Sequence, residues 1–472
     1  MRAVTVLASF LLAIKALPAA DRVESLYQMP DLSFGLYSGY LPVAGTSKQL
    51  HYVAALSENN WQTDPVLLWF NGGPGCSSML GWLSENGPYS IIDGQSNFTK
   101  NQYSWNKEAT IIYIEAPAGV GYSLCTDSKD DCDKYNDFNS ADDSMQAFVQ
   151  LMTVKFPELK NNDVYITGKS YAGIFVPRLA ERVDWYIGNC TANKSCPFVP
   201  KLMGYIVCNG VTDYRYDNLK GFIDTAYWFG LISTSLWNDL INNQCYENNP
   251  PVAQCNQWID ELDKNLTNIP VFDILGKCWT PTIKQTLSEC GGQSSLNFDE
   301  KRQMTAHRYA SFIKSPLSSK HVGANPPCTY SQPLIDFMNN AAVRKALHIP
   351  DSAPEWIFCN DAIIGNYTKY PNGSIEVYES LRGKYKMLKL SGDTDLAVPT
   401  SATKGWIENL NWPISKEWKQ FFVNGQVGGY TEERENGKFL FATIHGAGHM
   451  APQWKPAPSY HVVFNFIKNQ PI

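Results

Sequence analysis

Long apolar runs, runs of basic side chains and C-x-x-C pairs are all missing from this sequence of 472 residues once its first 20 residues are set aside. A membrane-spanning helix needs about 20 apolar residues in succession, so we expect a soluble chain that does not bind membranes. The net charge of −6 is spread along the chain and disfavours nucleic acid as a partner. Cysteine and histidine are not clustered as zinc ligands are, and we expect neither a metal nor a cofactor.

The first 20 residues have the pattern of a secretory signal peptide. Arg2 precedes a short apolar run over residues 3–14, and small residues follow at Ala16, Ala19 and Ala20. This order is typical of a segment that is removed after export. We therefore expect the chain to enter the secretory pathway.

The cysteine count agrees with an oxidising compartment. The chain has 12 cysteines, and an even number after a signal peptide favours disulfides over metal ligands. Cys125 with Cys132 and Cys190 with Cys196 are close enough to close local loops, and the sequence leaves the other pairings open, including whether Cys208 is free. The N-x-[ST] sequences are candidate glycosylation sites, at Asn97, Asn189, Asn193, Asn265, Asn366 and Asn372.

Apolar runs alternate with amphipathic stretches through much of the chain. Residues 32–56 have the alternation of an antiparallel hairpin, and a helix is expected from Ser140, as the capping residue, to residue 156. Strands that alternate with helices predict an α/β fold with a mostly parallel sheet. Buried strands are expected at residues 65–70, 110–115, 164–167, 202–207, 384–390 and 438–444, with further helices from residue 170 to about 187 and over residues 459–469.

The predicted organisation is a signal peptide over residues 1–20 and a sheet domain in two parts, over residues 21–213 and 331–472. Residues 214–330 interrupt this domain with several cysteines, many asparagines and no convincing buried strand. We interpret them as a mainly helical, disulfide-tied insertion that caps the sheet.

A serine lies where an expected strand turns abruptly into a helix. The turn is residues 168–173, with the sequence GKSYAG. Such a turn holds the serine in a cramped backbone geometry that exposes its hydroxyl, and the first N–H groups of the helix point at what it attacks. A phosphate-binding loop also ends in Gly-Lys-Ser, but its first glycine would fall on Asp163. Ser170 is therefore a candidate nucleophile.

Two more expected strands end in loops that contain an acid and a base. Residues 391–395 (SGDTD) follow one strand, and residues 445–449 (HGAGH) follow the other. Loops at the carboxyl ends of parallel strands meet at one edge of a sheet. The chain order Ser170, Asp395, His449 is that of an α/β-hydrolase, in which His449 moves the serine proton and Asp395 orients His449.

Five motifs in order resemble those of the serine carboxypeptidase family, which includes carboxypeptidase Y and cathepsin A. They cover nearly the whole mature chain: WFNGGPGCSS at residues 69–78, EAPAGVGYS at 115–123, GKSYAG at 168–173, GDTD at 392–395 and GHMAP at 448–452. The resemblance implies an α/β-hydrolase that removes C-terminal residues from peptides or proteins through an acyl-enzyme on Ser170, in a secreted, lysosomal or vacuolar setting. It also implies a disulfide between Cys76 and Cys359.

The resemblance further implies roles for residues around Ser170. The N–H groups of Gly73 and Tyr171 would form the oxyanion hole, in line with a glycine-rich loop whose backbone can approach a ligand closely. The terminal carboxylate of the substrate would be held by Trp69, Asn71, Gly72, Glu85 and residue 169.

Position 169 departs from the family, because Lys169 stands where glutamate is usual. A carboxylic acid has to be protonated to donate a hydrogen bond to a carboxylate, whereas lysine stays charged through the acidic and neutral range. Lys169 would either attract the substrate carboxylate or form an ion pair with Glu85. We expect substrate affinity to fall less with rising pH than in an enzyme with two acids.

Two other functions share these motifs. An acyltransferase of the same fold would pass the acyl group from Ser170 to an alcohol instead of water. A protective or binding protein would keep the fold without turnover. The sequence also leaves a homodimer open.

Overall fold

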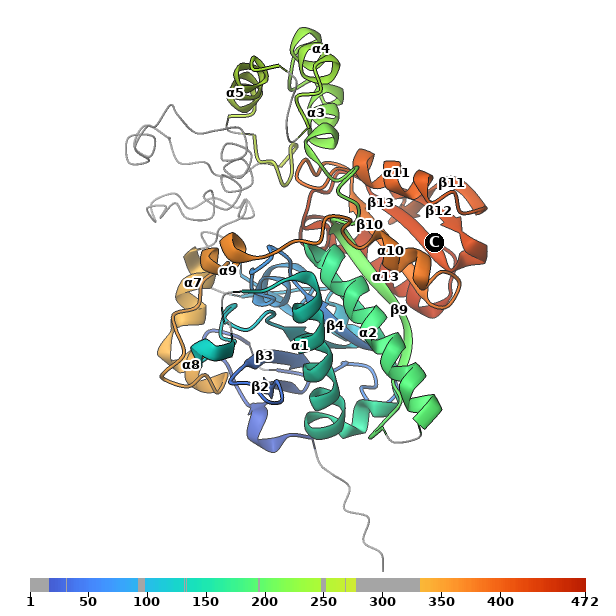
Figure 1. Cartoon of the computed structure of the whole chain (residues 1–472). Coiled ribbons are helices and arrows are strands. Elements are labelled where there is room, and N and C mark those ends of the chain that lie inside the picture. Colours follow the sequence, from blue (N-terminus) through green and yellow to red (C-terminus); the bar gives the residue numbers. More distant parts are fainter. Residues whose placement is uncertain are drawn as a thin grey trace, which may run out of the picture.

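The computed structural model describes residues 17–472 except residues 31, 92–97, 131, 133, 194–195, 248–251, 268 and 277–331. An 11-stranded sheet forms its centre (Figure 1). None of the helices within this described part is long and apolar enough to cross a membrane.

The sheet is mixed and mostly parallel, as predicted. The six strands β7, β4, β8, β9, β10 and β13 run parallel to one another, and antiparallel strands extend both edges. In sheet order the strands are β1 (Arg22–Val23), β2 (Leu36–Pro42), β3 (Gln49–Ala55), β7 (Thr110–Ile114), β4 (Val66–Phe70), β8 (Asp163–Ser170), β9 (Lys201–Gly210), β10 (Lys386–Gly392), β13 (Phe439–Ile444), β12 (Gln426–Arg434) and β11 (Ile414–Val423), and β5 (Tyr89–Ser90) pairs separately with β6 (Thr99–Lys100).

The continuous apolar strands are buried on both faces. In β4, Val66, Leu68 and Phe70 belong to one core cluster, whereas Leu67 and Trp69 belong to the other. Successive side chains of a strand point to opposite faces, so each apolar run contributes to two cores. Helices cover these two faces: α1 (Asp137–Gln150), α2 (Ala172–Asn193), α9 (Asp361–Asn366), α10 (Ile375–Ser380) and α11 (Thr400–Asn409) on one, and α7 (Gln332–Asn339), α8 (Ala341–Ala346), α12 (Ala451–Trp454), α13 (Pro456–Lys468) and the π-helical turn η2 (Gly81–Glu85) on the other.

The described part of the insertion is helical. Helices α3 (Leu219–Trp228), α4 (Thr234–Asn242) and α5 (Cys255–Asn265) share a third core cluster and project beyond the sheet in Figure 1. Leu396, which follows β10 in the sequence, belongs to the same cluster. The insertion therefore packs on the loop that follows β10. The boundaries at residues 213 and 331 stay a prediction.

Helix α1 begins earlier than the sequence pattern indicated. We expected Ser140 to cap it, but the Asn136 side chain accepts hydrogen bonds from the N–H groups of Phe138 and Asn139, each at 2.9 Å. The Asn139 side chain in turn accepts from the Asn136 N–H at 2.8 Å. This reciprocal capping box satisfies backbone donors at the helix start, so α1 begins at Asp137.

The cysteine pairing that the resemblance implied is present. Cys76 is bonded to Cys359, and the expected local pairs Cys125–Cys132 and Cys190–Cys196 also form. A fourth disulfide, Cys245–Cys255, lies in the insertion, and Cys208 is a buried free thiol. Cys278, Cys290 and Cys328 lie outside the described residues.

Glycosylation at the six candidate asparagines stays a prediction. Asn193, Asn265, Asn366 and Asn372 are exposed, and Asn189 is half-buried. Asn97 lies outside the described residues.

Candidate active site

Ser170 ends β8 in a left-handed backbone conformation. Its φ of 61° is uncommon for a residue other than glycine, and it is the geometry expected of a nucleophile at a strand-to-helix turn. We expected the strand to stop at Gly168, but β8 continues to Ser170. After a register shift it stays paired with β9 through Ser170 and Gly210. The Ser170 carbonyl accepts the Val211 N–H at 3.1 Å, which fixes the turn.

The glycine loop after β4 lies directly against this turn. A Cβ on residue 72 would come within 2.2 Å of the Tyr171 backbone nitrogen, so only glycine allows this approach. Gly73, with a φ of 116°, continues the loop. The loop is held from outside by the Cys76–Cys359 disulfide. The two backbone N–H groups assigned to the oxyanion hole therefore come from segments that are in contact.

Asp395 and His449 form a buried pair. His449 Nδ1 lies 2.7 Å from Asp395 Oδ2, and the two side chains are 4 % and 0 % exposed. Asn209 Nδ2 donates to the same carboxylate oxygen at 3.0 Å, and the Ala397 N–H donates to Oδ1 at 2.8 Å. An ionised carboxylate only accepts, so the proton of His449 lies on Nδ1 and Nε2 is left as the basic nitrogen.

The histidine is also fixed by the insertion. The His449 N–H donates to the Phe272 carbonyl at 2.6 Å, and the two rings are 5.0 Å apart. Within the described residues no hydrogen bond joins Ser170 Oγ to His449. Catalytic hydrogen bonds often close only when substrate is bound, and we expect this one to form in the complex with substrate.

The residues assigned to carboxylate binding are brought together. Trp69 Nε1 donates to Asn71 Oδ1 at 2.6 Å, which leaves the Nδ2 group of Asn71 as a donor. Lys169 Nζ lies 2.8 Å from Glu85 Oε1, and their side chains are 9 % and 1 % exposed. Of the two arrangements that the sequence allowed for Lys169, the structure has the ion pair.

Comparison with known proteins decides the family. The profile of the serine carboxypeptidase family matches residues 27–469.

The chain belongs to the serine carboxypeptidase family.

Relatives of this family member agree over most of its length. The lysosomal protective protein of Mus musculus is 33 % identical, with 97 % of this chain and 95 % of the relative covered. Serine carboxypeptidase 1 of Hordeum vulgare is 31 % identical over 90 % of this chain and 87 % of its own length. The crystal structure of a prohormone-processing carboxypeptidase from Saccharomyces cerevisiae matches with a TM-score of 0.71 at 19 % identity, covering 96 % of this chain and 97 % of that one, which shows the common fold.

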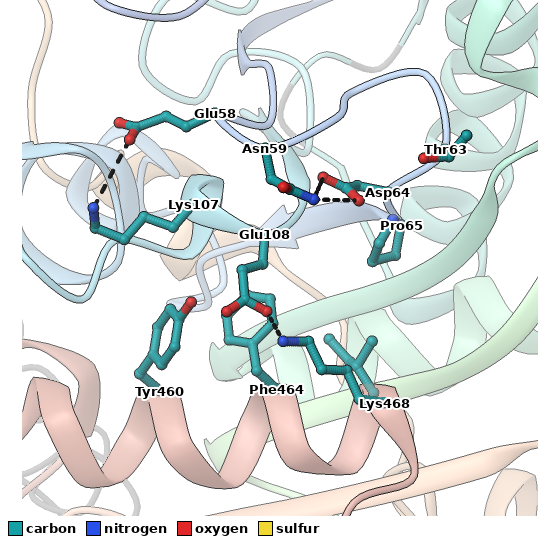
Figure 2. Close-up of a pocket in the computed structure, with 11 residues that line it drawn as sticks. Glu58, Asn59, Thr63, Asp64, Pro65, Lys107, Glu108, Tyr460, Phe464 and Lys468 are labelled. Atoms are coloured by element: carbon teal, nitrogen blue, oxygen red, sulfur yellow. Dashed lines mark hydrogen bonds and ion pairs between the residues drawn. The ribbon is translucent and has the colours of Figure 1, made fainter.

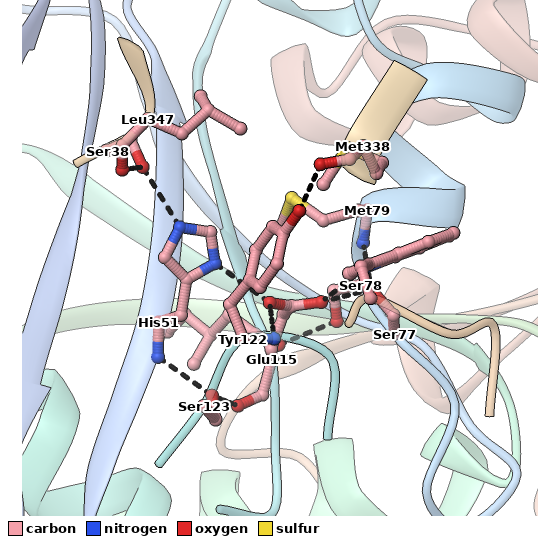
Figure 3. A network of polar contacts seen from close by, with 12 residues as sticks. Ser38, His51, Ser77, Ser78, Met79, Glu115, Tyr122, Ser123, Met338 and Leu347 are labelled. Carbon is pink, nitrogen blue, oxygen red and sulfur yellow. Dashed lines mark hydrogen bonds and ion pairs between the residues drawn. The ribbon is translucent and has the colours of Figure 1, made fainter. Parts of the chain in front are cut away.

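A second buried glutamate, Glu115, lies at the end of β7 in a polar network that sequence reasoning missed (Figure 3). Its Oε2 accepts from His51 Nδ1 and from the Tyr122 N–H, both at 2.8 Å. Its Oε1 accepts from Trp356 Nε1 at 3.2 Å and from the Ser77 hydroxyl. Glu115 thus links β3, the EAPAGVGYS segment and both segments joined by the Cys76–Cys359 disulfide.

The network continues from His51 to β2. The Ser38 hydroxyl donates to the Leu347 carbonyl at 2.7 Å and lies 2.9 Å from His51 Nε2. His51 therefore joins Ser38 to Glu115 through its two ring nitrogens.

A buried lysine lies near the triad acid and was also missed. Lys389, in the middle of β10, donates to the Gly210 carbonyl and to Thr212 Oγ1, the latter at 3.2 Å. Burial lowers the pKa of Lys389 to about 8, against the attraction of Asp217 and Asp395. The signal in the sequence was a lysine inside an otherwise apolar strand.

The described residues also form a pocket of about 700 Å³ at the opposite end of the sheet, between the loop before β4 and α13 (Figure 2). Four of its charged groups form ion pairs, Glu108 with Lys468 and Glu58 with Lys107 at 3.8 Å, and Asp64 accepts from the Asn59 side chain at 3.2 Å. None of the candidate site residues lines it. This pocket therefore contributes nothing to the site at Ser170.

Proposed function

We propose that this family member removes C-terminal residues from peptides and proteins, with Ser170, His449 and Asp395 as its catalytic triad. The observation that carries the proposal is that a left-handed Ser170 at the end of β8 and a buried His449–Asp395 pair in the loops after β13 and β10 lie at the same edge of the sheet. Few structural roles require a serine in that conformation.

The reaction follows from these groups. His449 Nε2 takes the Ser170 proton as Oγ attacks the scissile carbonyl, and Asp395 stabilises the imidazolium that forms. The N–H groups of Gly73 and Tyr171 bind the developing oxyanion. The C–N bond breaks as His449 protonates the leaving amine, and water then hydrolyses the acyl-serine by the same steps in reverse.

Recognition of the free C-terminus is assigned to the neighbouring cluster. The Asn71 Nδ2 group, the Gly72 N–H and the Lys169 ammonium are donors suited to a carboxylate, and Trp69 fixes the orientation of Asn71. Neither oxygen of Glu85 has a well-aligned hydrogen bond within the described residues. Glu85 holds Lys169 at the site, and the cluster accepts a substrate carboxylate on the accessible side of Lys169.

The compartment proposed is the lumen of the secretory pathway, by secretion or in a lysosome-like or vacuole-like organelle. Support comes from the signal pattern in residues 1–20, from the four disulfides, and from a relative named as a lysosomal protein. Disulfides of this kind do not persist in the cytosol.

Blocked dipeptides and a fluorophosphonate probe test the proposal. We expect wild-type protein to release the C-terminal amino acid, and Ser170→Ala to lose at least about 10³-fold in kcat with an unchanged fold, because the attacking atom is gone. The exposed Ser235 on α4 provides a matched control, and Ser235→Ala should keep full activity. Turnover by Ser170→Ala within about tenfold of wild type would remove Ser170 from its role.

The same experiment separates the other two functions. An acyltransferase would react with the probe but would require an alcohol acceptor to release product. A protective or binding protein would show no turnover with any of these substrates.

A further inference from the structure

Lys369 lies beside the residue that follows the nucleophile. It belongs to the segment between α9 and α10, and its Nζ atom is 5.5 Å from the centre of the Tyr171 ring. The Tyr171 ring is also 5.5 Å from the Tyr367 ring and 5.3 Å from the Phe175 ring. An ammonium group therefore lies on an aromatic cluster next to Ser170.

This ammonium group has no counter-ion among the described residues. The charge of Asp137 attracts the ammonium group from a distance. The two oxygens of Asp137 already accept hydrogen bonds, from the Tyr171 hydroxyl at 2.7 Å and from the Tyr370 N–H at 2.8 Å. No carboxylate oxygen in the described part of the chain lies within 4.0 Å of Lys369 Nζ, which is the limit for an ion pair. Loss of hydration beside the rings lowers the pKa of Lys369, although the residue as a whole keeps an exposed surface.

The cluster lies on the other side of Ser170 from the proposed carboxylate site. Lys169 contacts Glu85, and the charges of both groups shift the pKa of the Cys208 thiol. Cys208 belongs to the core under α13. Tyr171 belongs to the opposite core, under α1 and α2. Because residues 169, 170 and 171 are consecutive, we expect a substrate with its terminal carboxylate at Lys169 and its scissile carbonyl at Ser170 to continue toward Tyr171. Its acyl-side residue therefore reaches the Lys369 side.

We propose that Lys369 is a specificity-determining residue that selects substrates with an acidic side chain on the acyl side of the scissile bond. This inference rests on the proposed carboxypeptidase function. A glutamate or aspartate carboxylate would supply the missing counter-ion of Lys369, whereas a lysine or arginine side chain would be repelled.

The test uses blocked dipeptides with one leaving residue and with Glu, Gln or Lys on the acyl side. Glu and Gln have nearly the same shape, so the ratio of their kcat/KM values isolates the charge. We expect wild-type protein to prefer Glu over Gln by about tenfold, the size typical of a partly desolvated charge pair. In Lys369→Gln the ratio should fall to about one, and in Lys369→Glu the preferred substrate should change from Glu to Lys.

Lys345, exposed on α8, provides the matched control, and Lys345→Gln should keep the wild-type ratio. A Glu to Gln ratio of one or less in wild type, or a ratio unchanged in both Lys369 variants, would overturn the inference while leaving the carboxypeptidase function in place. No cleavage of any of the three substrates by wild-type protein would instead contradict the proposed function.

Discussion

Two buried glutamates, Glu115 and Glu85, differ in how completely they are satisfied. The Glu115 carboxylate is 0 % exposed and accepts from four donors, which include the His51 ring. The Glu85 carboxylate is 1 % exposed and has one polar partner among the described residues, the Lys169 ammonium. Burying a charge with few hydrogen-bond partners costs free energy. A protein therefore keeps such a group where a bound ligand can supply the missing partners. Full satisfaction indicates a structural role, and incomplete satisfaction next to Ser170 indicates a binding role.

The location of each glutamate agrees with this distinction. Glu115 lies below the glycine loop and joins it to Trp356, which is close in sequence to Cys359. Glu85 ends the η2 turn and reaches Lys169, the residue before the nucleophile. One acid therefore holds the loop in place, and the other lies where we propose that the substrate carboxylate binds.

Removal of the satisfied acid should have the largest effect. We expect Glu115→Ala to lower the free energy of unfolding by about 3–5 kcal/mol, because four buried donors lose their acceptor. Glu85→Ala should cost about 1–2 kcal/mol less than Glu115→Ala, because only one donor, the Lys169 ammonium, loses its acceptor. Urea unfolding with the disulfides intact measures both. Equal losses would contradict this distinction, because the two acids would then contribute equally to the free energy of unfolding.

Asp217 sharpens the comparison, because it is a half-buried acid whose two carboxylate oxygens differ in their hydrogen bonds. Its Oδ2 accepts from the Thr212 and Asp213 N–H groups at 2.6 and 3.0 Å, and its Oδ1 has no partner within the described residues. Burial raises its pKa from 3.8 to about 6. Between pH 3.8 and about pH 6, Asp217 is therefore protonated in the folded protein but not in the unfolded chain. The stability that this proton contributes is lost as the pH rises through about 6.

Asp217→Asn should remove this loss. We expect the stability of the variant relative to wild type to increase by about 2 kcal/mol between about pH 4 and about pH 7. Unfolding curves at the two pH values test it, with Asp351→Asn, at an exposed position, as the control. A difference between variant and wild type that does not change with pH would contradict the raised pKa.

Replacing Lys169 with the glutamate usual in the family tests the binding role of the Glu85–Lys169 pair, with an expected change in KM of about tenfold. In Lys169→Glu two carboxyl groups meet, and the pair donates to a substrate carboxylate only while one of them is protonated. We expect its KM to rise about tenfold from about pH 5 to about pH 7, whereas wild-type KM stays nearly constant. If the two profiles ran parallel, Lys169 would have no part in carboxylate recognition.

Much of this architecture could be predicted from the sequence. The buried strands are apolar runs, and Ser170, Asp395 and His449 lie at the ends of β8, β10 and β13 or in the loops that follow them, as the sequence predicted. The Cys76–Cys359 disulfide followed from family resemblance, because its partners are 283 residues apart and no local pattern connects them.

The remaining features depend on contacts that a sequence does not show. The hairpin of β11 and β12 was missed because the side chains of β11 are mostly exposed and lack an apolar alternation. His51 has no sequence signal for its role, since its partners Glu115 and Ser38 come from other strands. Whether Lys169 pairs with Glu85 or stays free for the substrate depends on how η2 packs against the end of β8. The sequence does not show this packing, so both arrangements stayed open.

The most direct test of the binding role of the Glu85–Lys169 pair compares a blocked dipeptide that ends in a free carboxylate with the same dipeptide amide. We expect wild-type protein to prefer the free acid, and Lys169→Met to lower the acid-to-amide ratio of kcat/KM at least about tenfold, because the substrate carboxylate then faces Glu85 without the lysine. Lys160→Met, at an exposed position before β8, should leave the ratio unchanged. A ratio in Lys169→Met equal to that of wild type would contradict the assignment of this pair to the substrate carboxylate.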